Sequence, residues 1–159
     1  MGQKPLKRNK HIQPLSREHH FGLLFCWKIR TGIKKDVEVN RIVKYVEYFF
    51  NTYMEPHFRA EETLLFNQIE HDMCKRACDD HQEIKNMVTG VLSGNDDSVE
   101  SLKNLAKKVD EHIRFEERSL FPLLELSLTE IQLNSIGESL DVLHSQKLVE
   151  QYDDEFWVE

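Results

Sequence analysis

Glycine and proline are scarce in this chain, which has 6 glycines and 4 prolines among its 159 residues. Both residue types interrupt regular structure, and two of the prolines lie within the first fourteen positions. Long uninterrupted elements must therefore follow. Helices fit best, because the apolar residues recur at three- and four-residue spacing and no alternating strand pattern competes with that spacing.

Three further features are missing: a cysteine framework, a long apolar run and an excess of basic charge. Cys26, Cys74 and Cys78 are an odd number at low density, which argues against the disulfide framework of a small secreted domain and predicts reduced thiols. No run approaches the roughly 18 apolar residues of a membrane span, and the N-terminus lacks the apolar stretch of a secretory signal. The net charge of -7 disfavours nucleic acid and anionic membranes as partners. We therefore expect a cytoplasmic protein that binds neither.

The length fits one domain, which the residue pattern divides into three parts. Residues 1–13 are basic and poor in apolar side chains, so we expect a flexible arm there. Residues 14–128 carry four helical patterns, and residues 129–159 form a helical and acidic tail. The fold class predicted is all-α, an antiparallel up-down-up-down four-helix bundle with a short C-terminal helical tail.

The capping and turn residues give approximate limits for the helices. The first is expected from an N-cap at Ser16 to Gly32, the second from Asp36 to about residue 69 with a kink at Pro56, the third from about Met73 to Leu92, and the fourth from Asp97 or Ser98 to about Ser127. Thr129 can open a short further helix. The aromatic pair Phe156 and Trp157 then docks either on the bundle or on a partner protein.

An internal repeat is the most informative feature of the sequence. Residues 57–66 read HFRAEETLLF and residues 112–121 read HIRFEERSLF, so the second and fourth helices carry the same ten-residue device. Positions four apart lie on one face of a helix, so His57 with Glu61, and His112 with Glu116, can point at the same ion.

The other two helices each offer one histidine or a histidine pair. These are His81 in the third helix and His19 or His20 in the first, where residue counts from the turns and the helical wheel favour His19. Mixed imidazole and carboxylate ligands suit iron, manganese or zinc, and two carboxylates able to bridge favour a pair of ions. We therefore expect a carboxylate-bridged centre of two iron ions, with zinc or manganese as weaker alternatives. Glu62 and Glu117, rotated by about 100° from the expected ligands, are predicted to support them or to face solvent.

At this point the residues resemble the hemerythrin-like, or HHE cation-binding, family. The resemblance covers about residues 15–126, through LSREH, HFRAEE, the single His81 and HIRFEERSLFP. It implies an antiparallel four-helix bundle with a non-haem di-iron site that binds dioxygen or a related small ligand such as NO. Carried over position by position, it implies terminal ligands at His19, His57, His81 and His112 and bridging ligands at Glu61 and Glu116.

The chain departs from the oxygen-carrying members of that family in two ways. Those members have two histidines four apart in the third helix, whereas the positions four before and four after His81 are Ala77 and Lys85. They also place the second carboxylate five residues after the histidine of the fourth helix, where this chain has glutamate at both four and five. A site with one fewer imidazole favours sensing, redox or iron handling at least as much as reversible oxygen carriage.

Other readings of the sequence stay open. His71, Cys74, Cys78 and His81 have spacings that could hold a structural zinc ion, which would compete with the di-iron site for His81. A metal-free helical interaction module is a further alternative, with its partner bound through the basic arm or the C-terminal tail. If the protein is an enzyme, we expect a di-iron oxidase, a peroxidase or an NO scavenger. Ferritin-type storage is disfavoured, since no histidine has a glutamate three residues before it.

Overall fold

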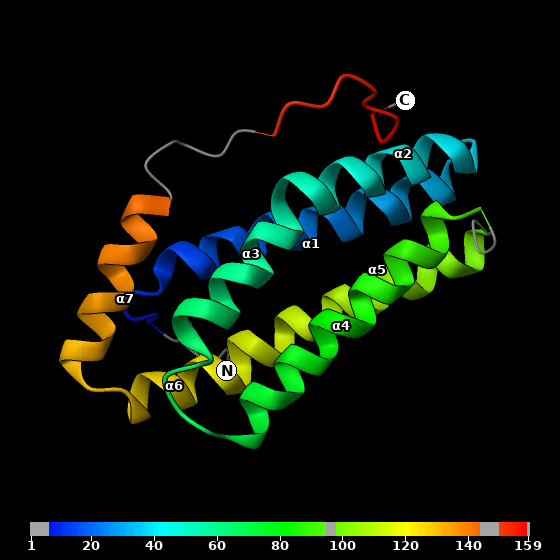
Figure 1. The fold of residues 1–159 in the computed structure, drawn as a ribbon. Coiled ribbons are helices and arrows are strands. Elements are labelled where there is room, and N and C mark those ends of the chain that lie inside the picture. Colours follow the sequence, from blue (N-terminus) through cyan, green and yellow to red (C-terminus); the bar gives the residue numbers. More distant parts are fainter. Residues whose placement is uncertain (1–6, 95–97, 144–149, 159) are drawn as a thin grey trace, which may run out of the picture.

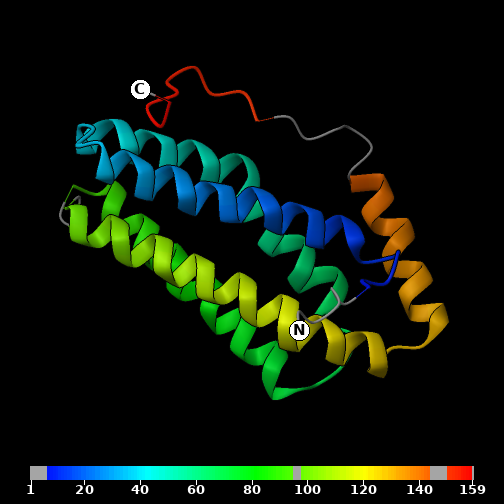
Figure 2. The same ribbon diagram turned by 180° about the vertical axis from the view of Figure 1, so that it is seen from behind.

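A computed structural model describes residues 7–94, 98–143 and 150–158, and this part of the chain is all helical, without a strand. Four long helical segments lie side by side, and a further helix lies across one end of the group (Figures 1 and 2). The segments are α1 (Gln13–Lys34), α2–α3 (Val39–Phe49 and Glu55–Ala60), α4 (Asp72–Leu92) and α5–α6 (Val99–Phe115 and Phe121–Ser127), with α7 (Glu130–Leu143) across the end. None of the helices in the described ranges is long and apolar enough to cross a membrane.

The first helix begins earlier than the sequence predicted. It starts at Gln13, with Pro14 in its first turn, where a proline costs no helical hydrogen bond because the first amides have no partner in the helix. Ser16 is therefore not an N-cap, and its hydroxyl instead donates a hydrogen bond of 2.8 Å to Glu117. The cap predicted at Asp36 is also wrong: this residue lies in the turn after α1 with a φ of 55°.

The segment before α1 is not solvated throughout, as the sequence had suggested for residues 1–13. Residues 1–6 lie outside the described part of the chain, but Ile12 is fully buried and the side chain of Arg8 contacts Glu117 and Glu125. The backbone amide of Asn9 also donates to Glu125, at 2.6 Å. The burial of Ile12 and the ion pairs of Arg8 hold these residues against the bundle near α6. The basic composition of the segment did not predict this contact.

Three π-helical turns widen the long helices at specific places. They are η1 (Phe50–Met54), η2 (Glu61–Leu65) and η3 (Glu116–Leu120). The first lies directly before α3, and Pro56 falls in the first turn of α3, where its missing amide breaks no regular hydrogen bond. The path of the chain bends between α2 and α3, which is the kink expected at Pro56 (Figure 1). The other two π-helical turns, η2 and η3, begin at Glu61 and Glu116, so the two copies of the sequence repeat also share the same local backbone structure.

The limits of the later helices agree closely with the sequence. Ser98 caps α5 by accepting a hydrogen bond from the Ser101 amide at 3.2 Å, while the alternative cap, Asp97, lies outside the described residues. Gly94 has a φ of 78°, a left-handed conformation that favours glycine, just after α4. Thr129 opens α7 as expected, because its hydroxyl accepts a hydrogen bond from the Gln132 amide at 3.1 Å.

Residues 150–158 of the acidic tail dock on the chain itself, alongside α2 (Figure 1). Phe156 is fully buried, and the space it fills exists because residue 32 is glycine: a Cβ there would lie 2.7 Å from the Phe156 ring. Arg41 on α2 also holds Asp154, at 2.6 Å. The sequence left open whether the aromatic pair docks on the bundle or on a partner protein, and Phe156 docks on the bundle.

The core consists of two apolar clusters, one toward each end of the long helices. One cluster holds Phe25, Phe49, Ile84 and Phe156, and the other holds Leu15, Leu65, Phe121 and residues of α7. On every long helix the histidine or glutamate expected in the metal site falls in sequence between members of the two clusters. Polar side chains that face inward at this level are therefore enclosed by apolar layers on both sides.

Candidate metal centre

Six polar side chains meet between the two apolar clusters. They come from α1, α3 and η2, α4, and α5 and η3: His19, His57, Glu61, His81, His112 and Glu116. Each of them is buried, and Glu61, His81 and Glu116 are 0% exposed. Burying ionised carboxylates is costly unless cations compensate them, so this concentration of glutamate and imidazole needs a specific partner.

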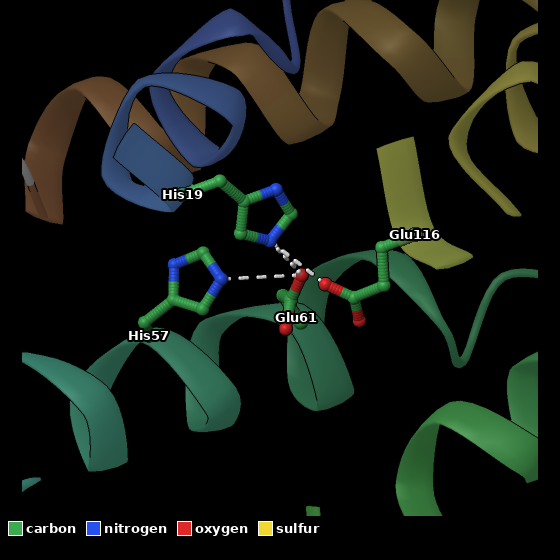
Figure 3. Close-up of side chains that lie close together, drawn as sticks. All are labelled: His19, His57, Glu61 and Glu116. Atoms are coloured by element: carbon green, nitrogen blue, oxygen red, sulfur yellow. Dashed lines mark hydrogen bonds and ion pairs between the residues drawn. The ribbon is translucent and has the colours of Figure 1, made fainter. Parts of the chain in front are cut away.

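The first half of the centre joins the N-terminal helix to the first repeat. The Nε2 atom of His19 lies 2.8 Å from Glu116 and 3.5 Å from Glu61, and the Nε2 atom of His57 lies 3.3 Å from Glu61. Figure 3 shows both imidazoles directed at the carboxylate oxygens. The ligand atoms of these four residues all lie within 4.8 Å of one another, which is compact enough for one metal ion.

The second half uses the same two glutamates with the other two histidines. The Nε2 atom of His81 lies 3.1 Å from Glu61 and 3.6 Å from Glu116, and the Nε2 atom of His112 lies 3.1 Å from Glu116. These four residues form a second group whose ligand atoms lie within 4.8 Å of one another. Glu61 and Glu116 belong to both groups, so each carboxylate can reach two ions at once.

Several of these atoms are buried without completing a hydrogen bond. They are Nε2 of His57, His81 and His112, both carboxylate oxygens of Glu61, and Oε2 of Glu116. Buried polar atoms are rarely left without partners, because each one costs about 1–3 kcal/mol. Nitrogen and oxygen atoms that lack a hydrogen bond and face one another in two compact groups have the character of metal ligands, so the donor set fits cations.

An outer carboxylate holds the other ring nitrogen of every histidine in the centre. The Nδ1 atoms of His19, His57, His81 and His112 lie 2.7, 3.0, 2.6 and 3.0 Å from Glu117, Glu18, Glu62 and Asp80, respectively. A carboxylate that accepts the Nδ1 hydrogen fixes the tautomer and leaves the Nε2 lone pair facing inward. Glu62 and Glu117 are therefore supporting groups, one of the two alternatives that the sequence left open.

Glu18 and Asp80 are functional residues that the sequence reasoning missed. Each one directly precedes a histidine of the centre but contacts a histidine on a different helix. Asp80 is itself held by Lys108 at 2.9 Å. The sequence does show an acidic residue immediately before His19 and before His81. Its role could not be predicted, because each carboxylate contacts a histidine on a different helix.

The charges of the centre shift the pKa values of its members in the direction of ion pairing. Burial lowers the pKa of His57, but the charge of Glu61 and the hydrogen bond with Glu18 outweigh burial and raise it to about 9. Burial also lowers the pKa of His81, but its contacts with the two glutamates outweigh burial and raise that pKa to about 10. Burial alone would raise the pKa of Glu116, yet the facing imidazoles hold it well below its usual range. Protons on the histidines thus balance the carboxylates when no metal does so.

A small cavity adjoins the centre. Its volume is about 30 Å³, and it is bounded by His19, His57, His112 and Glu18 on one side and by apolar side chains that include Tyr53 on the other. A cavity needs roughly 10–15 Å³ to hold one water molecule, so this one accommodates a ligand of a few atoms. Most of the other side chains that line it are apolar.

The other candidate ligands lie outside the centre. His20, the alternative to His19, is exposed. The proposed zinc set does not form a cluster: His71 caps α4 by accepting the Met73 amide at 3.0 Å, and His81 already faces the two glutamates. Cys74 and Cys78 are free thiols, as is Cys26, in agreement with the expected reduced state.

The fold and the site together define a helical protein with a buried histidine and carboxylate centre for cations. Residues 10–124 match the family model of the hemerythrin HHE cation-binding domain. The chain therefore belongs to the hemerythrin HHE cation-binding family. Comparisons with curated proteins and with solved structures gave no match.

Proposed function

We propose that this protein binds two non-haem iron ions between its long helices, which form the antiparallel up-down-up-down bundle expected of the family. In this proposal Glu61 and Glu116 bridge the ions, His19 and His57 complete the ligands of one, and His81 and His112 complete those of the other. The single observation that carries the proposal is the set of buried ring nitrogens and carboxylate oxygens that face one another without completing a hydrogen bond.

The donor chemistry supports iron over the alternatives. Imidazole with carboxylate is a set that suits iron, whereas structural zinc sites are typically rich in thiolate and none of the described cysteines joins either group. Two carboxylates shared between two groups of ligands are typical of paired iron or manganese centres in helical bundles. A metal-free module would leave the buried carboxylates to be balanced by protons on the histidines alone.

The chain's own residues define what the centre does with a ligand. When bound, the irons supply an open coordination position and redox chemistry for a small molecule such as O2 or NO. The cavity beside His57 has room for a molecule of that size, and its lining is largely apolar. The outer carboxylates keep the histidines in one orientation. We propose sensing, redox chemistry or iron handling as the role. A catalytic version would be an oxidase, a peroxidase or an NO scavenger.

Elemental analysis of the purified protein, together with visible spectra before and after addition of oxygen and azide, tests the proposal. The expected result is near two irons per chain with absorption bands that respond to azide. His19→Ala should lower the iron content, while the matched control His20→Ala, one residue away but exposed, should not. Zinc that depends on Cys74 and Cys78 but not on His57 would overturn the proposal, and so would a fully folded protein that binds no metal.

A further inference from the structure

All four tyrosines of the chain lie in one contiguous cluster, together with Trp157. Ring centroids are 6.1 Å apart between Tyr53 and Tyr48, and 4.8 Å apart between Tyr48 and Tyr152. Tyr45 continues the series, 5.1 Å from Tyr152 and 5.3 Å from Trp157. We call these five residues the tyrosine chain. Phenylalanine would fill almost the same space. The concentration of all four tyrosines in this cluster therefore points to a role for their hydroxyl groups.

The inner end of the tyrosine chain reaches the metal centre. Tyr53 is 8% exposed and lines the same small cavity as His19 and His57. Burial and a hydrogen bond with Tyr48 raise the pKa of Tyr53, so its phenol stays protonated at neutral pH. The amide of Gln151 donates to the Tyr48 hydroxyl at 3.1 Å, which joins this end to the docked tail.

The outer end of the tyrosine chain opens at the surface. Tyr152 and Trp157 line a groove together with Trp27, which is 51% exposed. A small molecule in solution can therefore approach the indole or phenol at this end without entering the metal centre. The path from Tyr53 to this groove passes from one oxidisable ring to the next.

Tyr45 has a proton acceptor built beside it. Its hydroxyl donates to Oε1 of Glu150 at 2.5 Å, and Oε2 of Glu150 is held by Lys28 at 2.5 Å. The Lys28 ammonium also lies 4.0 Å from the centre of the Trp157 ring. A tyrosine that gives up an electron must also lose its phenol proton to remain neutral. A carboxylate in direct hydrogen-bond contact can take that proton.

We propose that the tyrosine chain conducts single electrons between the groove at the surface and the cavity beside the metal centre. The inference rests on the proposed function and takes hydrogen peroxide as the oxidant. Iron held by the six ligands would supply the redox chemistry that reduces one peroxide to two waters, which consumes two electrons delivered one at a time and two protons from the solvent. Each electron leaves Tyr45 and passes by way of Tyr48, whose ring centroid is 6.4 Å from that of Tyr45, and Tyr53 to the centre, so that Tyr48 and Tyr53 end unchanged. The phenol proton of Tyr45 passes to Glu150, which leaves a neutral tyrosyl radical beside a carboxyl group. A reductant such as ascorbate returns an electron at the groove, and Glu150 returns the proton.

The first test uses iron-loaded protein treated with hydrogen peroxide and frozen within milliseconds to seconds for electron paramagnetic resonance. The wild type should give a tyrosyl radical that Tyr45→Phe removes. Tyr48→Phe, which keeps the ring and breaks the series in the middle, should lower the yield at Tyr45 severalfold. Trp27→Phe removes an oxidisable ring outside the series and should leave that yield unchanged. An unchanged yield in Tyr48→Phe, or no radical in the wild type, would overturn the proposal.

A second test needs no metal and so separates this inference from the proposed function. Metal-free protein is oxidised by one electron with photoexcited ruthenium tris-bipyridine and persulfate, which attack from solution. The radical should form on Tyr45. The yield of this radical should be lower in Glu150→Gln, because the proton acceptor is lost. A radical confined to Trp27 and Trp157 would refute conduction. Thermal melts of each variant confirm its fold, and Tyr53→Phe, at the inner end of the series, provides a second break if Tyr48→Phe does not fold.

Discussion

Replacing Gly32 by alanine tests how the C-terminal segment is held. A Cβ at this position would lie 2.7 and 2.9 Å from two atoms of the Phe156 ring and 3.0 Å from Ile42. Alanine in a helix interior gains about 1 kcal/mol over glycine, but overpacking a filled site costs about 1–3 kcal/mol. The ring is fully buried, so it has no free space into which to move. The difference between these terms is a net loss, so we expect Gly32→Ala to lower the free energy of unfolding by up to about 2 kcal/mol.

The matched control is Gly22→Ala on the same helix. There a Cβ would meet the terminal methyl of Ile113 at 2.6 Å, but that methyl is the end of a flexible side chain and borders the cavity. The helical gain should prevail, so this variant should be as stable as the wild type or slightly more stable. Urea denaturation followed by circular dichroism measures both. The double variant Gly32→Ala with Phe156→Leu should lose less stability than the sum of the two single losses, since the smaller side chain relieves the contact. A Gly32→Ala protein that equals Gly22→Ala in stability would refute the argument.

Three further predictions concern the outer carboxylates, a helix cap and a thiol. Asp80→Asn should weaken iron binding by about 10–100-fold, because it removes the anion that orients His112, as measured by competition with a chelator. Ser98→Ala should lower the free energy of unfolding by about 1 kcal/mol through loss of its cap to the Ser101 amide, as measured by urea denaturation. Burial raises the pKa of the Cys78 thiol to about 11, so alkylation by iodoacetamide at pH 8 should be roughly a hundredfold slower than for free cysteine and should rise steadily with pH toward 11.

Each of these predictions has a clear contrary result. Iron affinity of Asp80→Asn equal to the wild type would mean that His112 is oriented by its packing alone. A Ser98→Ala protein of unchanged stability would mean that water replaces the cap. Alkylation of Cys78 as fast as free cysteine would mean that the thiol is more solvated than its partly buried position indicates, with Cys78→Ser as the control that identifies the modified site.

The sequence predicted the parts of the site that follow from spacing within one helix. His57 with Glu61, and His112 with Glu116, lie four residues apart, and that distance fixes a common face in any regular helix. The choice of His19 over His20 followed from residue counts and the helical wheel, and the structure buries His19 and leaves His20 exposed. The family model matches residues 10–124, a range that includes all of these residues.

Features that depend on contacts between distant segments could not be predicted in this way. Glu18 supports His57, and Phe156 fills the space at Gly32, only because packing brings together residues far apart in the chain. The early start of α1 depends on the burial of Ile12, which composition does not reveal. The π turns at Glu61 and Glu116 change the rotation of the following glutamates, so a wheel drawn for a regular helix does not give their direction.

The carboxylates that orient the histidines also connect the four long helical segments to one another. Glu18, Glu62, Asp80 and Glu117 each stand next in sequence to a residue of the centre, yet each orients a histidine that belongs to another helix. A rotation of any one helix therefore displaces its own ligand and releases a ligand elsewhere. The same coupling works in the opposite direction when a cation binds. In the proposed two-ion centre, histidines fixed by the first ion would already be oriented for the second, so we expect loading to be cooperative, with little protein holding one ion alone.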